Sequence, residues 1–248
     1  MIKKVLILIA FLLVASYLVM AMVRLNKMPQ DAVCREVEFN IRNNANSQQD
    51  GFITITELKR LLRQEGLYPQ GKRLEDVQCR KIEDYLMKNP YIDEVECFKT
   101  PADNVCVEVS QRIPMLYIMG DNGDRYYLDT KGKIMPHAGY VAHLAVVTGA
   151  VTRKNASALL KGLGTVMQQD SFWNDQIEQV HVTPTKELEL VPRVGDHVVF
   201  LGGANDMEEK LGKLKEFYQK ALSKAGWNKY SRINIEFNNQ IICTKKEK

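Results

Sequence analysis

The residue types that most often carry catalysis or bind metals are present in this chain, but their spacing assembles no recognisable centre. Four histidines are scattered and form no H-x-x-H or H-E-x-x-H pair on a predicted helix: His137, His143, His181 and His197. No G-x-S-x-G turn offers a serine nucleophile. Each histidine is therefore interpreted as an ordinary strand or loop residue. The sequence predicts no catalytic residue, no metal site and no cofactor, and we expect a protein that is not an enzyme.

One glycine pair has the placement of a phosphate-binding turn. Gly202 and Gly203 lie between a predicted strand and a predicted helix, where a helix N-terminus could bind an anion. However, Asp206, Glu208 and Glu209 occupy the first turn of that helix and would repel a phosphate. The glycines are better interpreted as residues of a turn that requires a positive φ.

The cysteines follow no metal or redox motif. They number five and include no C-x-x-C pair: Cys34, Cys79, Cys97, Cys106 and Cys243. In an oxidising compartment an odd count leaves at least one thiol unpaired. Side-chain alternation places Cys97 on the inner face and Cys106 on the outer face of two neighbouring strands, which argues against a bridge between them. Cys79 is expected on the inner face and Cys34 on the outer one. Unbridged thiols are the favoured interpretation, and bridging stays open.

The N-terminal segment predicts a membrane anchor. Residues 5–23 contain no charge, glycine or proline, and a helix of this length spans roughly 28 Å, close to the hydrocarbon thickness of a bilayer. Lys3 and Lys4 precede it, which predicts a cytoplasmic tail at residues 1–4 and the bulk of the chain outside. A cleaved signal peptide is an alternative, but the apolar run is long and no small-x-small site follows it. A buried core helix is a third alternative, disfavoured because the segment is apolar on every face.

After a linker at residues 24–32, the pattern predicts a β-α-α-β-β unit over residues 33–113. Strands are expected over residues 33–41, 92–99 and 104–112, where apolar and polar residues alternate. Helices are expected over residues 55–65 and about 74–88. Thr54 and Glu57 form a capping box at the start of the first helix, and residues 43–51 are expected to be a polar turn region.

Residues 114–243 predict a mixed, mostly antiparallel β-domain with two helices, followed by a charged tail at residues 244–248. Strands are expected over residues 115–119, 125–128, 177–182, 187–191, 197–201 and 232–243. Helices are expected over residues 155–169 and 206–225, where apolar residues recur with helical spacing. The fold class is therefore α+β, with one transmembrane helix before the two domains.

The order β-α-α-β-β directly after a single membrane span resembles a POTRA domain. The segments VCVEVSQRIP (residues 105–114) and KNPYI (residues 88–92) resemble the last strand and the helix-to-strand junction of this domain in the bacterial cell division FtsQ (DivIB) family. In the second domain, YYLDTKGKIMP (residues 126–136) resembles a hairpin of that family, and LAVVTG (residues 144–149) resembles the strand before its helix. The resemblance covers nearly the whole chain.

The last predicted strand is the candidate binding site. An edge strand with free backbone N–H and C=O groups is a template for adding a partner's strand. Taken without the resemblance, an interior strand or a lysine-protected edge is the favoured interpretation. The resemblance implies instead that the strand binds an FtsB/FtsL-like coiled-coil pair. The candidate partner-binding residues are Arg232, Asn234, Glu236, Phe237, Asn239 and Gln240. The family often has Arg-Tyr where this chain has Glu236 and Phe237, so we expect the backbone pairing but not a carried-over salt bridge.

The resemblance implies a single-pass inner-membrane protein at the division septum, with its bulk in the periplasm. It would act as a non-enzymatic scaffold that links its division partners to septal peptidoglycan synthesis. A POTRA-containing envelope chaperone is an alternative, but it would require repeated POTRA units or a long β-barrel. A membrane-anchored periplasmic enzyme is another, and it would require a catalytic cluster. The near balance of 34 basic against 30 acidic residues, with a net charge of +4, argues against a nucleic-acid partner.

Overall fold

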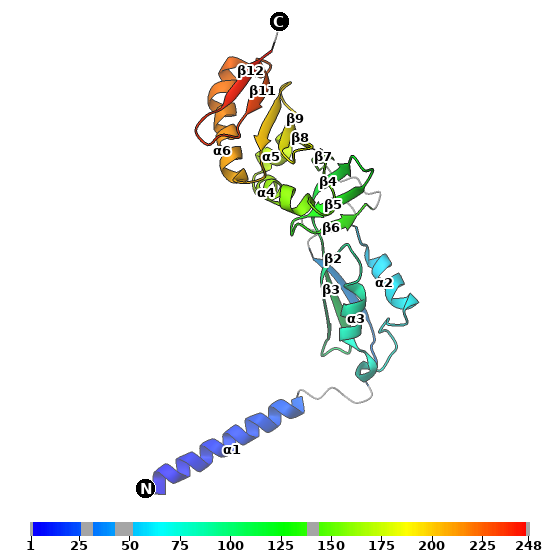
Figure 1. The fold of residues 1–248 in the computed structure, drawn as a ribbon. Helices are drawn as coiled ribbons and strands as arrows, with labels where there is room; N and C mark the ends of the chain where they lie inside the picture. Colours follow the sequence, from blue (N-terminus) through cyan, green and yellow to red (C-terminus); the bar gives the residue numbers. More distant parts are fainter. Residues whose placement is uncertain (1, 26–31, 43–51, 138–143, 247–248) are drawn as a thin grey trace. The chain divides into compact units, whose positions relative to one another are not determined.

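The computed structural model describes residues 2–25, 32–42, 52–137 and 144–246 (Figure 1). The chain divides into two compact units. The N-terminal unit comprises residues 1–46, 54–88 and 94–110, and the C-terminal unit comprises residues 47–53, 89–93 and 111–248. Most of the predicted linker at residues 24–32 and the whole turn region at residues 43–51 lie outside the described residues.

The first element is the helix α1 (Ile2–Leu25). It contains the whole of the apolar run at residues 5–23. Within the described part of the chain, no helix meets the combined length and hydropathy expected of a bilayer span. The membrane anchor therefore stays a prediction.

The N-terminal unit has the predicted β-α-α-β-β order. Its sheet contains β1 (Val37–Arg42), β2 (Ile92–Lys99) and β3 (Val105–Gln111) in the order β1-β3-β2, with β1 parallel to β3. Its helices are α2 (Ile55–Gln64), the short 3-10 helix η1 (Leu74–Asp76) and α3 (Cys79–Leu86). The core contains apolar side chains from both helices and the central strand, among them Leu58, Leu62, Ile82, Leu86, Val105 and Val107. Thr54 caps α2 as predicted, since its Oγ1 accepts a hydrogen bond from the Glu57 backbone N–H at 3.2 Å.

Two predicted elements of this unit are shorter than expected. The first strand begins at Val37 rather than at residue 33, because the preceding backbone pairs elsewhere: Cys34 N–H donates to Lys72 O, and Gly71 N–H donates to Cys34 O. As a result Val33 is 44% exposed and Cys34 is buried, so the expectation that Cys34 lies on the outer face is wrong. The second helix is interrupted at Val77, which has an extended backbone and a buried side chain.

The C-terminal unit is built on one nine-stranded sheet in the described part of the chain, with the order β12-β11-β10-β9-β8-β7-β4-β5-β6. The strands are β4 (Pro114–Gly120), β5 (Arg125–Asp129), β6 (Ile134–Pro136), β7 (Val146–Gly149), β8 (Ile177–Val182), β9 (Leu188–Pro192), β10 (Val198–Gly202), β11 (Tyr230–Asn234) and β12 (Ile242–Lys245). Three neighbouring pairs are parallel: β4 with β7, β7 with β8, and β10 with β11. The other pairs are antiparallel, as the mostly antiparallel prediction requires.

Helices α4 (Ala156–Gln169), α5 (Ser171–Gln176) and α6 (Met207–Phe217) pack against this sheet, and α6 continues through the π-helical turn η2 (Tyr218–Leu222) into α7 (Ser223–Ala225) (Figure 1). The two predicted helices are thus present. Helix α5 was not predicted, because its six residues are too few to show a helical period. It begins where Asp170 Oδ1 accepts a hydrogen bond from Phe172 N–H at 3.1 Å, and it buries Trp173 in the core.

The single last strand predicted over residues 232–243 is wrong. Strand β11 ends at Asn234, whose Oδ1 accepts a hydrogen bond from the Glu236 N–H at 2.9 Å in an Asx turn. The chain then reverses over residues 235–241 and returns as β12, which pairs antiparallel with β11. This pairing sets Arg232 opposite Thr244 and Asn234 opposite Ile242. The terminal segment is therefore a hairpin.

Candidate partner-binding site

The rim of the sheet is formed by β12 and not by the residues that the sequence indicated. Strand β11 is paired on both sides, with β10 and with β12, so the backbones of Arg232 and Asn234 face the interior of the sheet. Strand β12 is the last strand in the order, and no described strand lies beyond it. The other end of the order is β6, which has three residues and ends at Pro136, a residue without an N–H. The β12 rim is therefore the better candidate for strand addition.

Hydrogen bonds show which backbone groups of β12 face outward. Lys246 N–H donates to Lys229 O at 3.2 Å, so the backbone of Lys246 faces β11. Backbone direction alternates along a strand, so Thr244 and Ile242 also face β11, while Cys243 and Lys245 face the open side. Directly after β11, Ile235 N–H donates to Phe200 O of β10 at 3.0 Å, which agrees with this alternation. The rim thus offers the N–H and C=O groups of Cys243 and Lys245.

A β-bulge fixes the register of the rim. The register between β11 and β12 shifts between Tyr230 and Arg232, which leaves Ser231 as the extra residue. The Ser231 hydroxyl donates to Thr244 O at 3.4 Å. Beyond β12, the Nζ of Lys246 forms an ion pair with Asp196. The far end of the rim is thus held to the sheet by a backbone bond, a hydroxyl and an ion pair.

The side chains of the predicted residues in β11 hold the sheet together. Arg232 forms an ion pair with Glu189 Oε1 of β9 at 2.8 Å, and its guanidinium lies 4.7 Å from the centroid of the Phe200 ring. The side chain of Asn234 is engaged in the turn that ends β11. Both side chains therefore stabilise the part of the sheet formed by β9, β10 and β11.

Glu236 lies beside a buried lysine and a glycine with positive φ. Gly202 has φ +69°, and a Cβ there would lie 2.8 Å from Glu236 Cγ. The turn interpretation of Gly202 is therefore confirmed. Lys210 of α6 is buried and donates to Gly203 O at 2.8 Å. Burial lowers the pKa of Lys210, while the negative charges of Asp206 and Glu236 oppose that shift.

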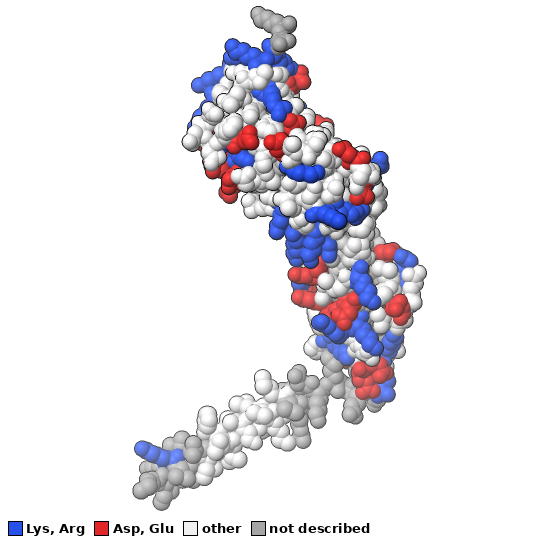
Figure 2. Space-filling view, in the orientation of Figure 1, with Lys and Arg blue, Asp and Glu red and all other residues white. Residues whose placement is uncertain are grey.

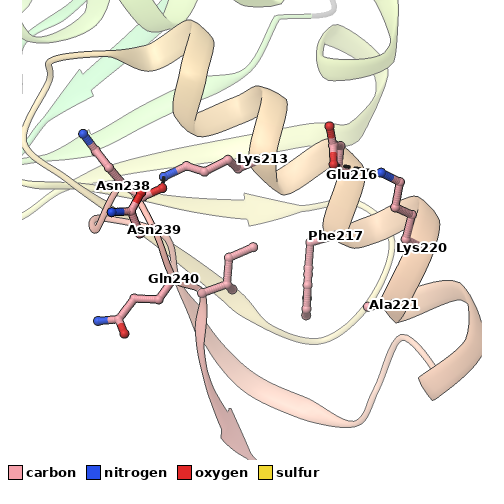
Figure 3. A pocket seen from close by; sticks show the side chains of 9 residues that line it. Lys213, Glu216, Phe217, Lys220, Ala221, Asn238, Asn239 and Gln240 are labelled. Carbon is pink, nitrogen blue, oxygen red and sulfur yellow. Dashed lines mark hydrogen bonds and ion pairs between the residues drawn. The ribbon is translucent and has the colours of Figure 1, made fainter.

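The connecting loop, residues 235–241, forms a groove with α6 and η2 (Figure 3). The Nζ of Lys213 donates to Phe237 O at 2.8 Å and to Asn238 O at 3.0 Å, which ties the loop to the helix. The groove has a volume of about 370 Å³. It is lined by Lys213, Glu216, Phe217, Lys220, Ala221, Asn238, Asn239, Gln240 and Ile241. Two predicted residues, Asn239 and Gln240, thus lie in the groove wall.

Two large apolar side chains near the rim are exposed to solvent. Phe237 in the loop is 45% exposed, and Ile242 at the start of β12 is 47% exposed. A continuous strand over residues 232–243 would place Phe237 on the same face as Ile233 and Ile235, but those two residues are fully buried and Phe237 is not. Figure 2 shows basic side chains gathered at the C-terminal end of this unit, where Lys224, Lys229 and Lys245 are exposed. The rim therefore combines open backbone, exposed apolar groups and positive charge.

The described histidines make ordinary structural contacts. The ring of His137 contacts the rings of Tyr117 and Tyr127 in a tilted arrangement, and His181 Nδ1 lies 3.2 Å from Thr148 Oγ1. His197 is buried, and its Nε2 lies 2.8 Å from the Tyr218 hydroxyl. His143 lies outside the described residues. Across the described residues, no three His, Cys, Asp or Glu side chains gather in a way that could hold a metal ion.

Three parts of the candidate site were not predicted from the sequence: the strand β12 and the side chains of Lys213 and Lys246. The signal that could have found β12 is the pair Asn238-Asn239, because consecutive asparagines between apolar segments favour a turn. Lys213 and Lys246 carry no local signal, since their partners lie far away along the chain.

Comparison with known proteins identifies both units. A family model described as "POTRA-like domain" matches residues 32–110, and one described as "FtsQ/DivIB, C-terminal related" matches residues 113–244. Three relatives are each named "Cell division protein FtsQ". The protein of Geotalea daltonii is 24% identical over 209 residues, which cover 78% of this chain and 74% of the relative. That of Rhodothermus marinus is 26% identical over 198 residues, covering 75% and 71%. That of Geobacter sp. is 26% identical over 212 residues, covering 78% and 74%. Since the C-terminal model alone spans more than half of the 248 residues, and a POTRA-like domain precedes it as the sequence motifs predicted, this chain belongs to the FtsQ/DivIB family of cell division proteins.

Proposed function

We propose that this protein is a non-enzymatic scaffold of the bacterial division machinery that captures a partner by adding the partner's strand to β12. The observation that carries the proposal is the open backbone of Cys243 and Lys245 on the outermost strand of the sheet. Membership of the FtsQ/DivIB family supports a role in cell division. The partner we propose is the periplasmic part of an FtsB/FtsL-like coiled-coil pair.

Backbone pairing would position the partner, and side chains would supply most of the selectivity. Two rim residues offer two N–H and two C=O groups, and each hydrogen bond contributes about 1 kcal/mol net. Four such bonds account for about 4 kcal/mol, which corresponds to millimolar affinity before the entropic cost of association. Tight binding therefore requires additional contacts. The exposed side chains of Ile242 and Phe237 and the groove beside α6 are the nearest surfaces for them.

The six predicted partner-binding residues divide into three roles in this proposal. Arg232 and Asn234 hold the sheet and the turn that support β12. Phe237, Asn239 and Gln240 lie in the exposed loop and would contact the partner directly. Glu236 would help to position the loop, because its side chain lies beside Gly202 and its negative charge acts on Lys210.

We propose that residues 5–23 anchor the protein in the inner membrane, with residues 1–4 in the cytoplasm. Residues 33–113 would then form a periplasmic POTRA domain, and residues 114–243 a periplasmic β-domain. The anchor would confine the protein to the septal membrane, and partner capture at β12 would couple its arrival to septal peptidoglycan synthesis. The absence of charge, glycine and proline from residues 5–23 supports this topology.

The test is a pair of substitutions at one rim position. Lys245→Pro removes an outward N–H and leaves the bonds to β11, because the inward partners are Thr244 and Lys246. Lys245→Ala removes only the side chain and keeps the N–H. We expect Lys245→Pro to weaken co-purification with the FtsB/FtsL-like pair at least about tenfold, since a lost bond and a ring clash together cost more than about 1.4 kcal/mol. Lys245→Ala should change it less than about threefold.

The fold of both variants is checked by thermal unfolding monitored through tryptophan fluorescence, because Trp173 and Trp227 both lie in the C-terminal unit. Equal capture of the partner by wild type and a folded Lys245→Pro variant would refute strand addition at β12. Equal loss in both variants would assign the effect to the lysine charge and would refute a backbone mechanism.

A further inference from the structure

A buried histidine lies next to the ion pair that holds the far end of the rim. His197 directly precedes β10 and is buried. Its Nε2 lies 2.8 Å from the Tyr218 hydroxyl of η2, and the two rings meet edge to face with their centroids 5.6 Å apart. The preceding residue, Asp196, forms the ion pair with Lys246 after β12. Two consecutive residues thus contact the helical layer and the rim.

The polar groups around the ring suit a neutral imidazole. The Tyr218 hydroxyl can donate to Nε2 only while that nitrogen carries no proton. Nδ1 is buried and has no hydrogen-bond partner among the described residues. A Cβ at Gly195 would lie 2.7 Å from Nδ1 and 3.3 Å from the Trp227 carbonyl oxygen, so this carbonyl lies near the same edge of the ring. A second ring proton would make Nε2 a donor and leave a positive charge buried.

The titratable groups that face the ring come from three elements. They are Tyr218 of η2, Asp196 of the connection between β9 and β10, and Lys246 after β12. Burial lowers the pKa of His197, and the positive charge of Lys246 lowers it further, while the Trp227 carbonyl and the negative charge of Asp196 oppose the shift. A protonated ring is therefore favoured in any state in which it reaches water.

The segment that would have to move lies at the surface. Residues 193–196 form a bend between β9 and β10 in which Val194 and Asp196 are exposed. Gly195 has φ +91°, a conformation that glycine adopts without strain. The pairing of β10 with β11 begins only at Val198, so His197 can leave Tyr218 without unpairing β10. Because Asp196 is bonded to His197, it would move as well, and its ion pair with Lys246 would break.

We propose that His197 is a pH-sensitive switch whose protonation frees the far end of the β12 rim. Lys246 would lose its ion pair, which weakens the backbone bond from Lys246 to Lys229 O beside the outward-facing Lys245. The ordinary histidine pKa of about 6.5 limits the effect: between pH 7.5 and pH 5.5 the ratio of open to closed rim can rise at most about tenfold. The consequence for strand capture rests on the proposed function, because the partner would bind the closed rim.

The experiment measures amide hydrogen exchange by mass spectrometry at pH 7.5 and pH 5.5 in the full chain purified in detergent, after correction for intrinsic exchange rates. We expect the protection of residues 242–246 to lie below that of β8, as local opening requires. We expect this protection to fall about three- to tenfold at pH 5.5. Residues 105–111 in the N-terminal unit should not show this fall.

Three variants test how the switch works. His197→Gln has no titrating ring and should abolish the pH effect at the rim. The matched control is His181→Gln, whose ring contacts Thr148 in a different part of the sheet, and it should keep the effect. Asp196→Asn removes the ion pair and keeps His197, so the rim should exchange rapidly at both pH values without a pH step.

Several results would overturn the inference. Rim protection that is independent of pH would do so, and so would rim protection equal to that of β8, which would assign the exchange to unfolding of the whole unit. A pH step that persists in His197→Gln or in Asp196→Asn would refute the route through these two residues.

Hydrogen exchange requires no partner, so its outcome is separate from that of the Lys245→Pro test. Failure of that test would remove strand addition and leave the switch in place. If strand addition holds, capture of the FtsB/FtsL-like pair should fall at pH 5.5 by the factor by which the closed fraction of the rim falls. His197→Gln should capture equally at both pH values. Wild-type capture that does not follow the closed fraction would refute regulation of the site.

Discussion

Replacement of Gly202 by alanine tests how the loop beside the rim is built. Gly202 ends β10 with φ +69°, and a left-handed backbone costs a residue with a Cβ about 1–2 kcal/mol. The added methyl would also lie 2.8 Å from Glu236 Cγ and 3.0 Å from its Cδ and Oε1. Moving the Glu236 side chain away costs about 1 kcal/mol more. We therefore expect Gly202→Ala to lower the free energy of unfolding by about 2–3 kcal/mol.

A double-mutant cycle separates the two contributions. In a Glu236→Ala background the new methyl no longer meets the longer side chain, so Gly202→Ala should cost only about 1–2 kcal/mol, and the coupling energy should be about 1 kcal/mol. Urea unfolding followed by tryptophan fluorescence measures both costs, because Trp173 and Trp227 report the C-terminal unit alone.

The matched control is Gly212→Ala in α6. A Cβ at Gly212 would meet no atom within 4 Å, and the residue has no positive φ. Alanine there should stabilise the helix by about 0.5–1 kcal/mol. A cost of Gly202→Ala that is the same in both backgrounds would refute the proposed contact with Glu236. A cost below about 0.5 kcal/mol would refute the backbone argument as well.

Two further predictions concern the same unit. Burial lowers the pKa of His197, and the positive charge of Lys246 lowers it further, while the negative charge of Asp196 opposes the shift. The Tyr218 hydroxyl lies within hydrogen-bond distance of the imidazole ring. The neutral imidazole is therefore favoured in the folded state. The stability that depends on a neutral His197 is fully present above the unfolded pKa of about 6.5. It is lost as the pH falls below that value, because protonation of the imidazole then favours the unfolded chain. Urea unfolding between pH 8 and pH 5 should show this loss, and His197→Gln should reduce the slope; an unchanged slope would contradict it. Lys213→Met should cost about 1 kcal/mol and speed amide hydrogen exchange in residues 237–241, because two loop carbonyls lose their donor. Lys220→Met, whose partner Glu216 lies on the same helix, should leave that exchange unchanged, and equal exchange in both variants would argue against the clamp.

Local signals allowed much of this fold to be predicted. The Thr54 cap, the helix α4 and the alternating strands β2 and β3 are encoded within short segments, and each formed where the pattern indicated. The errors arose where distant partners decide the structure. Ile233, Ile235 and Phe237 alternate as if in one strand, but the Asn234 side chain ends β11 and the chain reverses. Cys34 likewise pairs with the backbone of residues 71 and 72 rather than extending β1.

The candidate site was predicted in region but not in detail. The sequence indicated the C-terminal segment, and the structure puts an outermost strand there, eight positions or more beyond Asn234. Which backbone groups face outward could not be read from the alternation alone, because that depends on the hairpin register and on the bulge at Ser231. The tie between Lys213 and the loop joins residues 24 and 25 positions apart and leaves no periodic signal.

The outward pair Cys243 and Lys245 has a consequence for the accuracy with which a second chain would be aligned. Side chains of an added strand keep their faces only if the strand slides by an even number of residues. With two docking residues, a slide by two would abandon half of the available bonds, and a slide by one would turn every side chain to the wrong face. Because the docking edge is this short, any other register of the added strand loses backbone hydrogen bonds or misplaces its side chains. The edge would therefore select a single register for the incoming strand.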